Sequence, residues 1–212
     1  MSRVQLLTKK NTTNNVEGKK RHILIIGATG ITGRATVEHF IKLGNWNVTC
    51  CSRRTPTYDL MGAKHVTLDL QNKEDCIAKT KEYFTSVTHA MYGAVYELGN
   101  YEDGGVVMGW RNKKQIQTNG EMFENFLTPL LQYAPNFVHL SFMQGGKAYG
   151  AHVLGVNPLA VPCKEDAPRV VHENFYWLHE DFAKDCVKKS NGKFSYTIWR
   201  PVSSIYIYSY MA

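Results

Sequence analysis

The sequence contains few cysteines, and their arrangement argues against two kinds of site. There are five, an odd number, and no two of them form a Cys-x-x-Cys pair. They are Cys50, Cys51, Cys76, Cys163 and Cys186. Without paired spacings, neither a metal site nor a disulfide framework is expected.

Long apolar runs are also missing. No stretch approaches the roughly 20 apolar residues that are needed to span a bilayer, and no apolar segment of the signal-peptide type precedes the fold. We therefore expect a protein with no membrane partner in a reducing compartment, most simply the cytoplasm.

Acidic residues are outnumbered by basic ones, 18 to 25, which gives a formal net charge of +7. Part of the excess lies in residues 1–20, where lysines stand among asparagine and threonine. This composition predicts a disordered basic tail. Because aromatic and basic residues are not interleaved, no nucleic-acid partner is expected. Residues 21–212 have a length that suits a single domain.

The most informative motif is a glycine-rich turn between an apolar run and a helical pattern. His22–Ile26 leads into Gly-Ala-Thr-Gly-Ile-Thr-Gly, and helical spacing follows. Such a unit predicts a strand, a tight turn and a helix whose N-terminus binds a pyrophosphate. The G-x-x-G-x-x-G spacing resembles that of the extended and atypical short-chain dehydrogenases. The expected phosphate-loop residues are Gly27, Thr29, Gly30, Ile31 and Gly33.

The next predicted strand, residues 48–51, ends without an acidic residue. Ser52, Arg53 and Arg54 follow it, at the position that meets the adenosine ribose in this architecture. A carboxylate there would repel a 2′-phosphate, whereas guanidinium groups bind phosphate oxygens in pairs. NADPH is therefore the predicted cofactor, with Ser52 assisting the two arginines. The alternative interpretation is a solvated basic turn.

Strand and helix patterns alternate along the rest of the chain. Further strands are expected at 66–68, 89–92, 137–140 and 194–199. Further helices are expected at 73–83, 112–133 and 174–189. Alternation of this kind predicts a doubly wound parallel α/β sheet, the Rossmann fold, with its ligand at the carboxyl ends of the strands.

The helix predicted at 174–189 carries an apolar stripe. The stripe consists of Phe175, Leu178, Phe182 and Cys186. Helical spacing predicts that these side chains face the core. His179, on the same helix, is expected to face solvent, whereas His139, inside a predicted strand, is expected in the core.

The Tyr-x-x-x-Lys pair of most short-chain dehydrogenases is absent. None of the 12 tyrosines has a lysine four positions later. On a helix, that spacing places both groups on one face, where the ammonium can lower the pKa of the phenol. A different set of residues must therefore carry any chemistry.

Several blocks, in order, resemble those of the progesterone 5β-reductase/iridoid synthase family of atypical short-chain dehydrogenases. They include Gly-Gly-Lys-Ala-Tyr-Gly at 145–150, the acidic block 165–169, Asn-Phe-Tyr-Trp at 174–177 and Trp-Arg-Pro at 199–201. Further agreement lies at 52–54, 69–70 and 133–136, so the resemblance covers residues 21–204.

The resemblance implies hydride transfer from NADPH to an enone, with a lysine and a tyrosine at the reacting carbonyl. Lys147 occupies the place of the family lysine, where it serves both nicotinamide and substrate. Asp69 and Leu70 would border the adenine. Pro201 and Val202 would lie near the carboxamide.

The catalytic tyrosine is where the sequence departs from the family. Trp177 stands at its position, and an indole donates a hydrogen bond but does not readily supply a proton. Tyr176 and Tyr149 are the alternative donors. Tyr176 is turned about 100° from its neighbour on a helix, so it would need a different orientation.

The chain also stops twelve residues after Arg200, where family members continue into a region that covers the substrate. We expect a fragment, a divergent isoform or an altered reading frame, with apolar surface left exposed. The small-molecule partner is therefore expected to be an enone or another activated carbonyl.

Two alternatives to an NADPH-dependent reductase stay open. One is a catalytically weak or inactive NADP(H)-binding protein, which Trp177 and the short C-terminus favour. The other is a relative of the sugar-nucleotide epimerases and dehydratases, against which the missing Tyr-x-x-x-Lys and the arginine pair argue. The sequence does not fix the oligomeric state and leaves a homodimer open.

Overall fold

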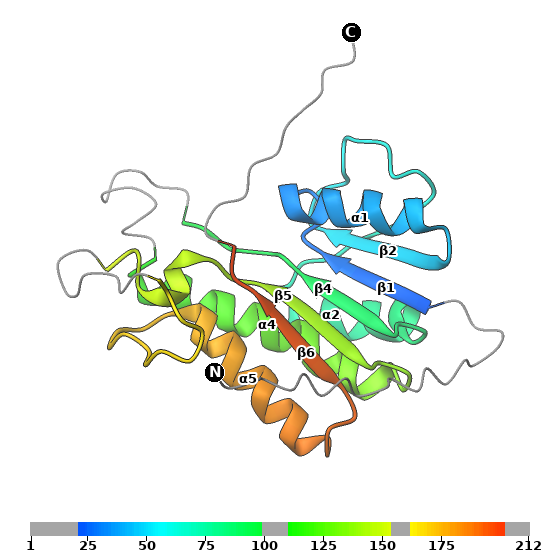
Figure 1. The fold of residues 1–212 in the computed structure, drawn as a ribbon. Helices are drawn as coiled ribbons and strands as arrows, with labels where there is room; N and C mark the ends of the chain where they lie inside the picture. Colours follow the sequence, from blue (N-terminus) through cyan, green and yellow to red (C-terminus); the bar gives the residue numbers. More distant parts are fainter. Residues whose placement is uncertain (1–20, 99–109, 154–161, 202–212) are drawn as a thin grey trace, which may run out of the picture.

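The computed structural model describes residues 21–98, 110–153 and 162–201, which form one parallel sheet with helices on both faces (Figure 1). The strand order is β3-β2-β1-β4-β5-β6. The strands are β1 (Arg21–Ile26), β2 (Trp46–Ser52), β3 (Lys64–Thr67), β4 (His89–Tyr92), β5 (His139–Met143) and β6 (Ser195–Trp199). Because β1 pairs with both β2 and β4, the order reverses there, and a ligand crevice is expected at its carboxyl end.

The helices cover the two faces unequally. Helix α1 (Ile31–Leu43) packs on one face, and α2, α4 and α5 lie on the other (Figure 1). Their bounds are Lys73–Lys79, Lys113–Tyr133 and Phe175–Lys189, and a π-helical turn, Thr80–Phe84, extends α2. A 3₁₀ turn, η3 (Gly146–Tyr149), follows β5. The predicted doubly wound fold is confirmed.

Strand β1 anchors both layers of the core. Ile23 and Ile25 pack with Val37 of α1, whereas Leu24 and Ile26 belong to the cluster beneath α4 and α5. All four are at most 4% exposed. A strand that is buried on both faces reads as a continuous apolar run, which is why the sequence marks it so clearly.

Three strands begin and end at different residues from those predicted. β2 spans Trp46–Ser52 rather than 48–51, β3 spans Lys64–Thr67 rather than 66–68, and β5 spans His139–Met143 rather than 137–140. Phe137 is buried, but it lies in a turn in which its N–H donates to the carbonyl of Ala134. Apolar character therefore marked burial at this position, not strand pairing.

The buried face of α5 is rotated from the predicted stripe. Its buried residues are Phe175, Tyr176, His179 and Ala183, and Leu178 is 43% exposed. The expectation that His179 faces solvent is wrong, because its ring is 1% exposed and stacks on Phe123 of α4 at 4.4 Å. The expectation of a core His139 is also wrong, because this residue is only half-buried and contacts Ser195 Oγ. Contact with α4 as well as the sheet turns α5 and brings Tyr176 inward.

Burial of His179 makes the stability of the fold depend on pH. Desolvation lowers the pKa of His179 to about 4, while a hydrogen bond to the Asn119 carbonyl opposes the shift. The unfolded chain, with a pKa near 6.5, binds the proton first, so stability is lost as pH falls from 6.5 towards 4. We expect protonation of His179 alone to lower the free energy of unfolding by about 2 kcal/mol between pH 7 and pH 5.

Urea unfolding at the two pH values tests this expectation. His179→Phe keeps a ring against Phe123 but cannot titrate, so the loss of stability on acidification should shrink by that amount. The exposed His39, changed to Phe, is the matched control and should leave the pH dependence as it is. An unchanged slope in His179→Phe would contradict the assignment.

Candidate functional site

The glycine turn after β1 is locked by its own backbone. Gly27 has φ of +92°, and a Cβ there would lie 2.9 Å from the carbonyl carbon of Gly93. The N–H groups of Gly27 and Ala28 both donate to the Cys51 carbonyl at 3.0 Å. Only glycine fits this position, because both the dihedral angle and the contact exclude a side chain.

Gly30 and Gly33 let α1 begin directly at the turn. A Cβ on Gly33 would lie 2.1 Å from the Gly27 carbonyl oxygen, so the helix packs against the turn without a side chain between them. Gly30 is the N-cap of α1, and neither a side-chain cap nor an acidic residue occupies the first turn. The free N–H groups of that turn, with the helix dipole, form a site for an anion.

A cavity of about 310 Å³ opens at the carboxyl ends of β1, β2 and β3. Its volume lies within the range of ligand pockets. Eight of the predicted cofactor residues line it: Gly27, Thr29, Gly30, Ser52, Arg53, Arg54, Asp69 and Leu70. Two of the five predicted phosphate-loop residues do not line it: Ile31 is 52% exposed at the start of α1, and Gly33 is buried against the turn. Lys147 and Pro201 do not line it either.

The turn after β2 carries the two arginines on its exposed side. Both Arg53 and Arg54 are exposed, and the Ser52 hydroxyl donates to the Arg54 carbonyl at 2.6 Å. Ser52 Oγ also lies 2.9 Å from Nε2 of His65. Ser52 therefore holds the shape of the turn, which leaves the two guanidinium groups at the cavity.

The turn after β3 is fixed in the same way. The N–H of Gln71 donates to the Asp69 carboxylate at 3.1 Å, and the Asn125 amide donates to the Leu70 carbonyl at 3.0 Å. These contacts hold the turn that carries Asp69 and Leu70, both of which line the cavity.

Lys147 lies at the other end of the site, in η3 after β5. Its Nζ sits 3.9 Å from the ring centroid of Trp110, and its carbonyl accepts a hydrogen bond of 2.9 Å from the Asn174 amide. Burial lowers the pKa of Lys147, and the negative charge of Glu97 opposes that change. The ammonium thus lies over an aromatic face.

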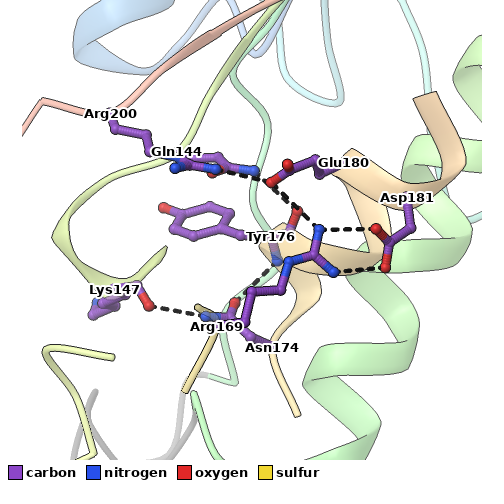
Figure 2. Close-up of polar contacts among 8 residues, drawn as sticks. All are labelled: Gln144, Lys147, Arg169, Asn174, Tyr176, Glu180, Asp181 and Arg200. Atoms are coloured by element: carbon purple, nitrogen blue, oxygen red, sulfur yellow. Dashed lines mark hydrogen bonds and ion pairs between the residues drawn. The ribbon is translucent and has the colours of Figure 1, made fainter. Parts of the chain in front are cut away.

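Tyr176 points from α5 towards the loop that carries Lys147 (Figure 2). A Cβ on Gly145 would lie 3.8 Å from the Tyr176 hydroxyl and 3.4 Å from the carbonyl oxygen of Pro201. The ring also meets Trp110, with centroids 5.1 Å apart. Burial raises the pKa of Tyr176 to about 12, with a further contribution from Glu97, so the phenol keeps its proton at neutral pH.

Trp177 and Tyr149 lie elsewhere. Both line a second cavity, of about 470 Å³, with Arg169 and Arg200. The Arg169 guanidinium lies 5.6 Å from a Trp177 ring centroid, and the Arg200 guanidinium 5.5 Å from that of Tyr149. Of the four predicted catalytic residues, the structure groups Tyr176 with Lys147 and separates both from Trp177 and Tyr149. Val202 lies outside the described residues.

A polar network fixes the position of Tyr176 (Figure 2). The Gln144 amide donates to the Tyr176 carbonyl, and its oxygen accepts from Arg200, which also pairs with Glu180 at 2.8 Å. Arg169 pairs in bidentate fashion with Asp181, at 2.8 Å for both contacts. The ends of β5, β6 and the start of α5 are thereby joined.

Sequence reasoning missed four residues that shape this half of the site. They are Glu97, Trp110, Gln144 and Asn174. Asn174 had a signal, since Asn before a helical pattern predicts an N-cap, and its carboxamide oxygen accepts from the Tyr176 N–H. No sequence signal points to Glu97 or Trp110, because neither belongs to a motif and only folding of the chain brings them to the site.

The fold and the first cavity define a class: a Rossmann-type dinucleotide-binding domain with its crevice at the strand reversal. A comparison with family models agrees, since residues 23–200 match the NAD dependent epimerase/dehydratase family. The chain belongs to this family. Within the described ranges, no helix has both the length and the apolar character that crossing a bilayer requires.

Curated relatives agree with the resemblance that the sequence motifs carried. The chain is 28% identical over 188 residues to an (S)-8-oxocitronellyl enol synthase of Antirrhinum majus, across 84% of this chain and 44% of that one. It is 30% identical over 179 residues to a 3-oxo-Delta(4,5)-steroid 5-beta-reductase of Arabidopsis thaliana, across 78% and 42%. The predicted progesterone 5β-reductase/iridoid synthase relationship is confirmed. The chain spans less than half the length of these relatives.

Solved structures show the same fold at lower identity. The UDP-Glc/GlcNAc 4-epimerase from Campylobacter jejuni superposes with a TM-score of 0.65 at 18% identity, over 85% of this chain and 53% of the other. A yeast methylglyoxal/isovaleraldehyde reductase complexed with NADPH gives 0.58 at 11%, over 85% and 54%. At these identities the likeness shows the fold alone.

Proposed function

We propose that this chain is an NADPH-dependent reductase domain that delivers hydride to an enone or another activated carbonyl. The observation that carries the proposal is the meeting of the glycine turn and the arginine pair at one cavity. Support for the reaction comes from relatives that are named as a steroid 5-beta-reductase and enol synthases.

The described residues fit a phosphorylated dinucleotide. The uncapped start of α1 suits the pyrophosphate, with Gly30 leaving room for close approach. Arg53 and Arg54 would hold the 2′-phosphate, with Asp69 and Leu70 beside the adenine. Lys147 and Pro201 would lie at the nicotinamide end, with Val202 next in the chain.

When bound, the nicotinamide supplies the hydride, and this chain's own residues stabilise the charge that develops on the substrate oxygen. Tyr176, still protonated at neutral pH, would donate a hydrogen bond to that oxygen. The Lys147 ammonium would add a positive charge nearby. Donors aimed at a developing oxyanion are worth about 2.7–4 kcal/mol each in measured enzymes.

The cofactor assignment is tested by replacing the arginines. Charged hydrogen bonds contribute about 1.5–3 kcal/mol, so Arg53→Ala with Arg54→Ala should weaken NADPH binding roughly 10- to 150-fold. NADH binding should change little, because NADH lacks the 2′-phosphate. Fluorescence titration of both nucleotides measures the effect. Lys42→Ala, an exposed cation at the end of α1, is the control; equal loss for both nucleotides would remove the phosphate assignment.

Turnover is tested separately with a simple enone, 2-cyclohexen-1-one, by following NADPH oxidation. Oxidation above the rate of free NADPH supports the reductase. Tight NADPH binding without oxidation supports the second candidate, an NADP(H)-binding protein without turnover. That candidate is favoured by Trp177, which stands at the family's tyrosine position and lines the other cavity.

A further inference from the structure

The Lys147 ammonium contacts the buried ring of Trp110, a residue that no motif contains. Its side chain is 4% exposed, although it lies just before α4 and not within an element. The Lys147 Nζ lies 3.9 Å from its ring centroid. At this distance the indole face attracts a cation, and indole does so more strongly than the phenyl ring.

The ring of Trp110 is itself held in place by the first turn of α5. Phe175 lies against it with centroids 4.5 Å apart, and Tyr176 meets it edge-on at 5.1 Å. These residues form one buried cluster with Ile116 and Ala148. One aromatic ring therefore touches both Lys147 and Tyr176, which come from separate elements.

The backbone around Glu97 is held by buried amide side chains of α4. The N–H of Tyr96 donates to the Asn119 carboxamide at 2.8 Å, and that of Leu98 to the Gln115 carboxamide at 2.9 Å. Asn119 and Gln115 are at most 1% exposed. The backbone on both sides of Glu97 is thus held against α4, so the chain beside the Lys147 ammonium has a defined path.

We propose that Trp110 is a positioning residue, which holds the Lys147 ammonium beside Tyr176 through its indole face. The inference rests on the proposed function for its effect on turnover. The placement of the ammonium can be measured without cofactor or substrate.

The first arm of the test is NMR of the free protein after reductive ¹³C-methylation of its lysines. Methyl groups on Lys147, assigned by their absence in Lys147→Arg, should resonate upfield because they lie over the indole ring. Trp110→Phe should reduce this upfield shift, and Trp110→Leu should abolish it. Trp46→Phe is the matched control, because the Trp46 ring also carries a cation, Arg21 at 4.3 Å, on β2. It should leave the Lys147 signal in place.

The second arm is steady-state kinetics. Trp110→Phe should lower kcat about 3- to 30-fold, the loss expected for a weakened cation–π contact, and leave the NADPH Kd within twofold. A Lys147 signal without an upfield shift in the unsubstituted protein overturns the proposal, as does an unchanged kcat in Trp110→Phe. If the unsubstituted chain neither binds NADPH nor turns over, the proposed function fails, while the NMR arm still decides the placement. A Trp110→Phe variant that melts early is replaced by Trp110→Tyr, for which the same outcomes hold.

Discussion

Removing one oxygen atom from Tyr176 should abolish most of the turnover and leave cofactor binding intact. In Tyr176→Phe the ring keeps its contact with Trp110, so the fold of the site is retained. The hydroxyl beside Gly145 is lost, and with it the donor to the substrate oxygen. Loss of one such donor costs about 10²–10³ in kcat. Stopped-flow or steady-state oxidation of NADPH with the enone measures it, alongside a nucleotide titration.

The two other aromatic candidates provide matched controls. Tyr149→Phe removes a hydroxyl from the second cavity and should leave kcat within about twofold, because no donor near Lys147 is lost. Trp177→Tyr restores the family's residue. If Trp177→Tyr raises the rate and Tyr176→Phe does not lower it, the proton donor belongs at position 177 and the assignment of Tyr176 is wrong.

Adding a single methyl group at Gly33 should strongly destabilise the fold. In Gly33→Ala the new Cβ would lie 2.1 Å from the Gly27 carbonyl oxygen and 2.8 Å from its carbonyl carbon. Both atoms are backbone, so α1 must move away from β1. Overpacking usually costs about 1–3 kcal/mol, and since no flexible side chain can yield here we expect at least about 3 kcal/mol. Urea unfolding followed by circular dichroism measures the loss.

Gly30→Ala separates folding from binding at the same turn. Its φ of −81° suits alanine, and a Cβ there would lie 3.4 Å from the Gly27 carbonyl oxygen. Stability should therefore fall by less than about 1 kcal/mol, while NADPH binding weakens because the methyl group occupies the space of the pyrophosphate. Equal stability losses in the two variants would contradict the close packing of Gly33.

The fold followed from the sequence because its signals were local and mutually consistent. The apolar run at Ile23–Ile26, the glycine spacing and the alternation of strand and helix patterns together indicate a parallel sheet. The predicted and observed elements differ where a residue is buried without belonging to a paired strand, or where packing between helices sets the buried face. Phe137 is buried in a turn, and α5 is rotated by its contact with α4, which no periodicity within the helix encodes.

The candidate site was predictable only in part, for the same reason. Residues of the first cavity came from turns that directly follow strands, so the topology alone could place eight of them together. At the second end, the pairing of Lys147 with Tyr176 depends on the rotation of α5 and on Trp110, which enters from another part of the chain. Tertiary contacts decide which of two adjacent aromatic residues faces inward, and one-dimensional spacing does not contain that information.

The two halves of the nucleotide cavity differ in how freely evolution can alter them. The glycine turn is tied to the doubly buried β1, so a change there propagates into both layers of the core. Arg53 and Arg54 stand on an exposed turn whose shape depends on the hydroxyl of Ser52 and not on either guanidinium. If Arg53 and Arg54 hold the 2′-phosphate as proposed, substitutions at these two surface positions would exchange one nicotinamide coenzyme for the other without destabilising the interior.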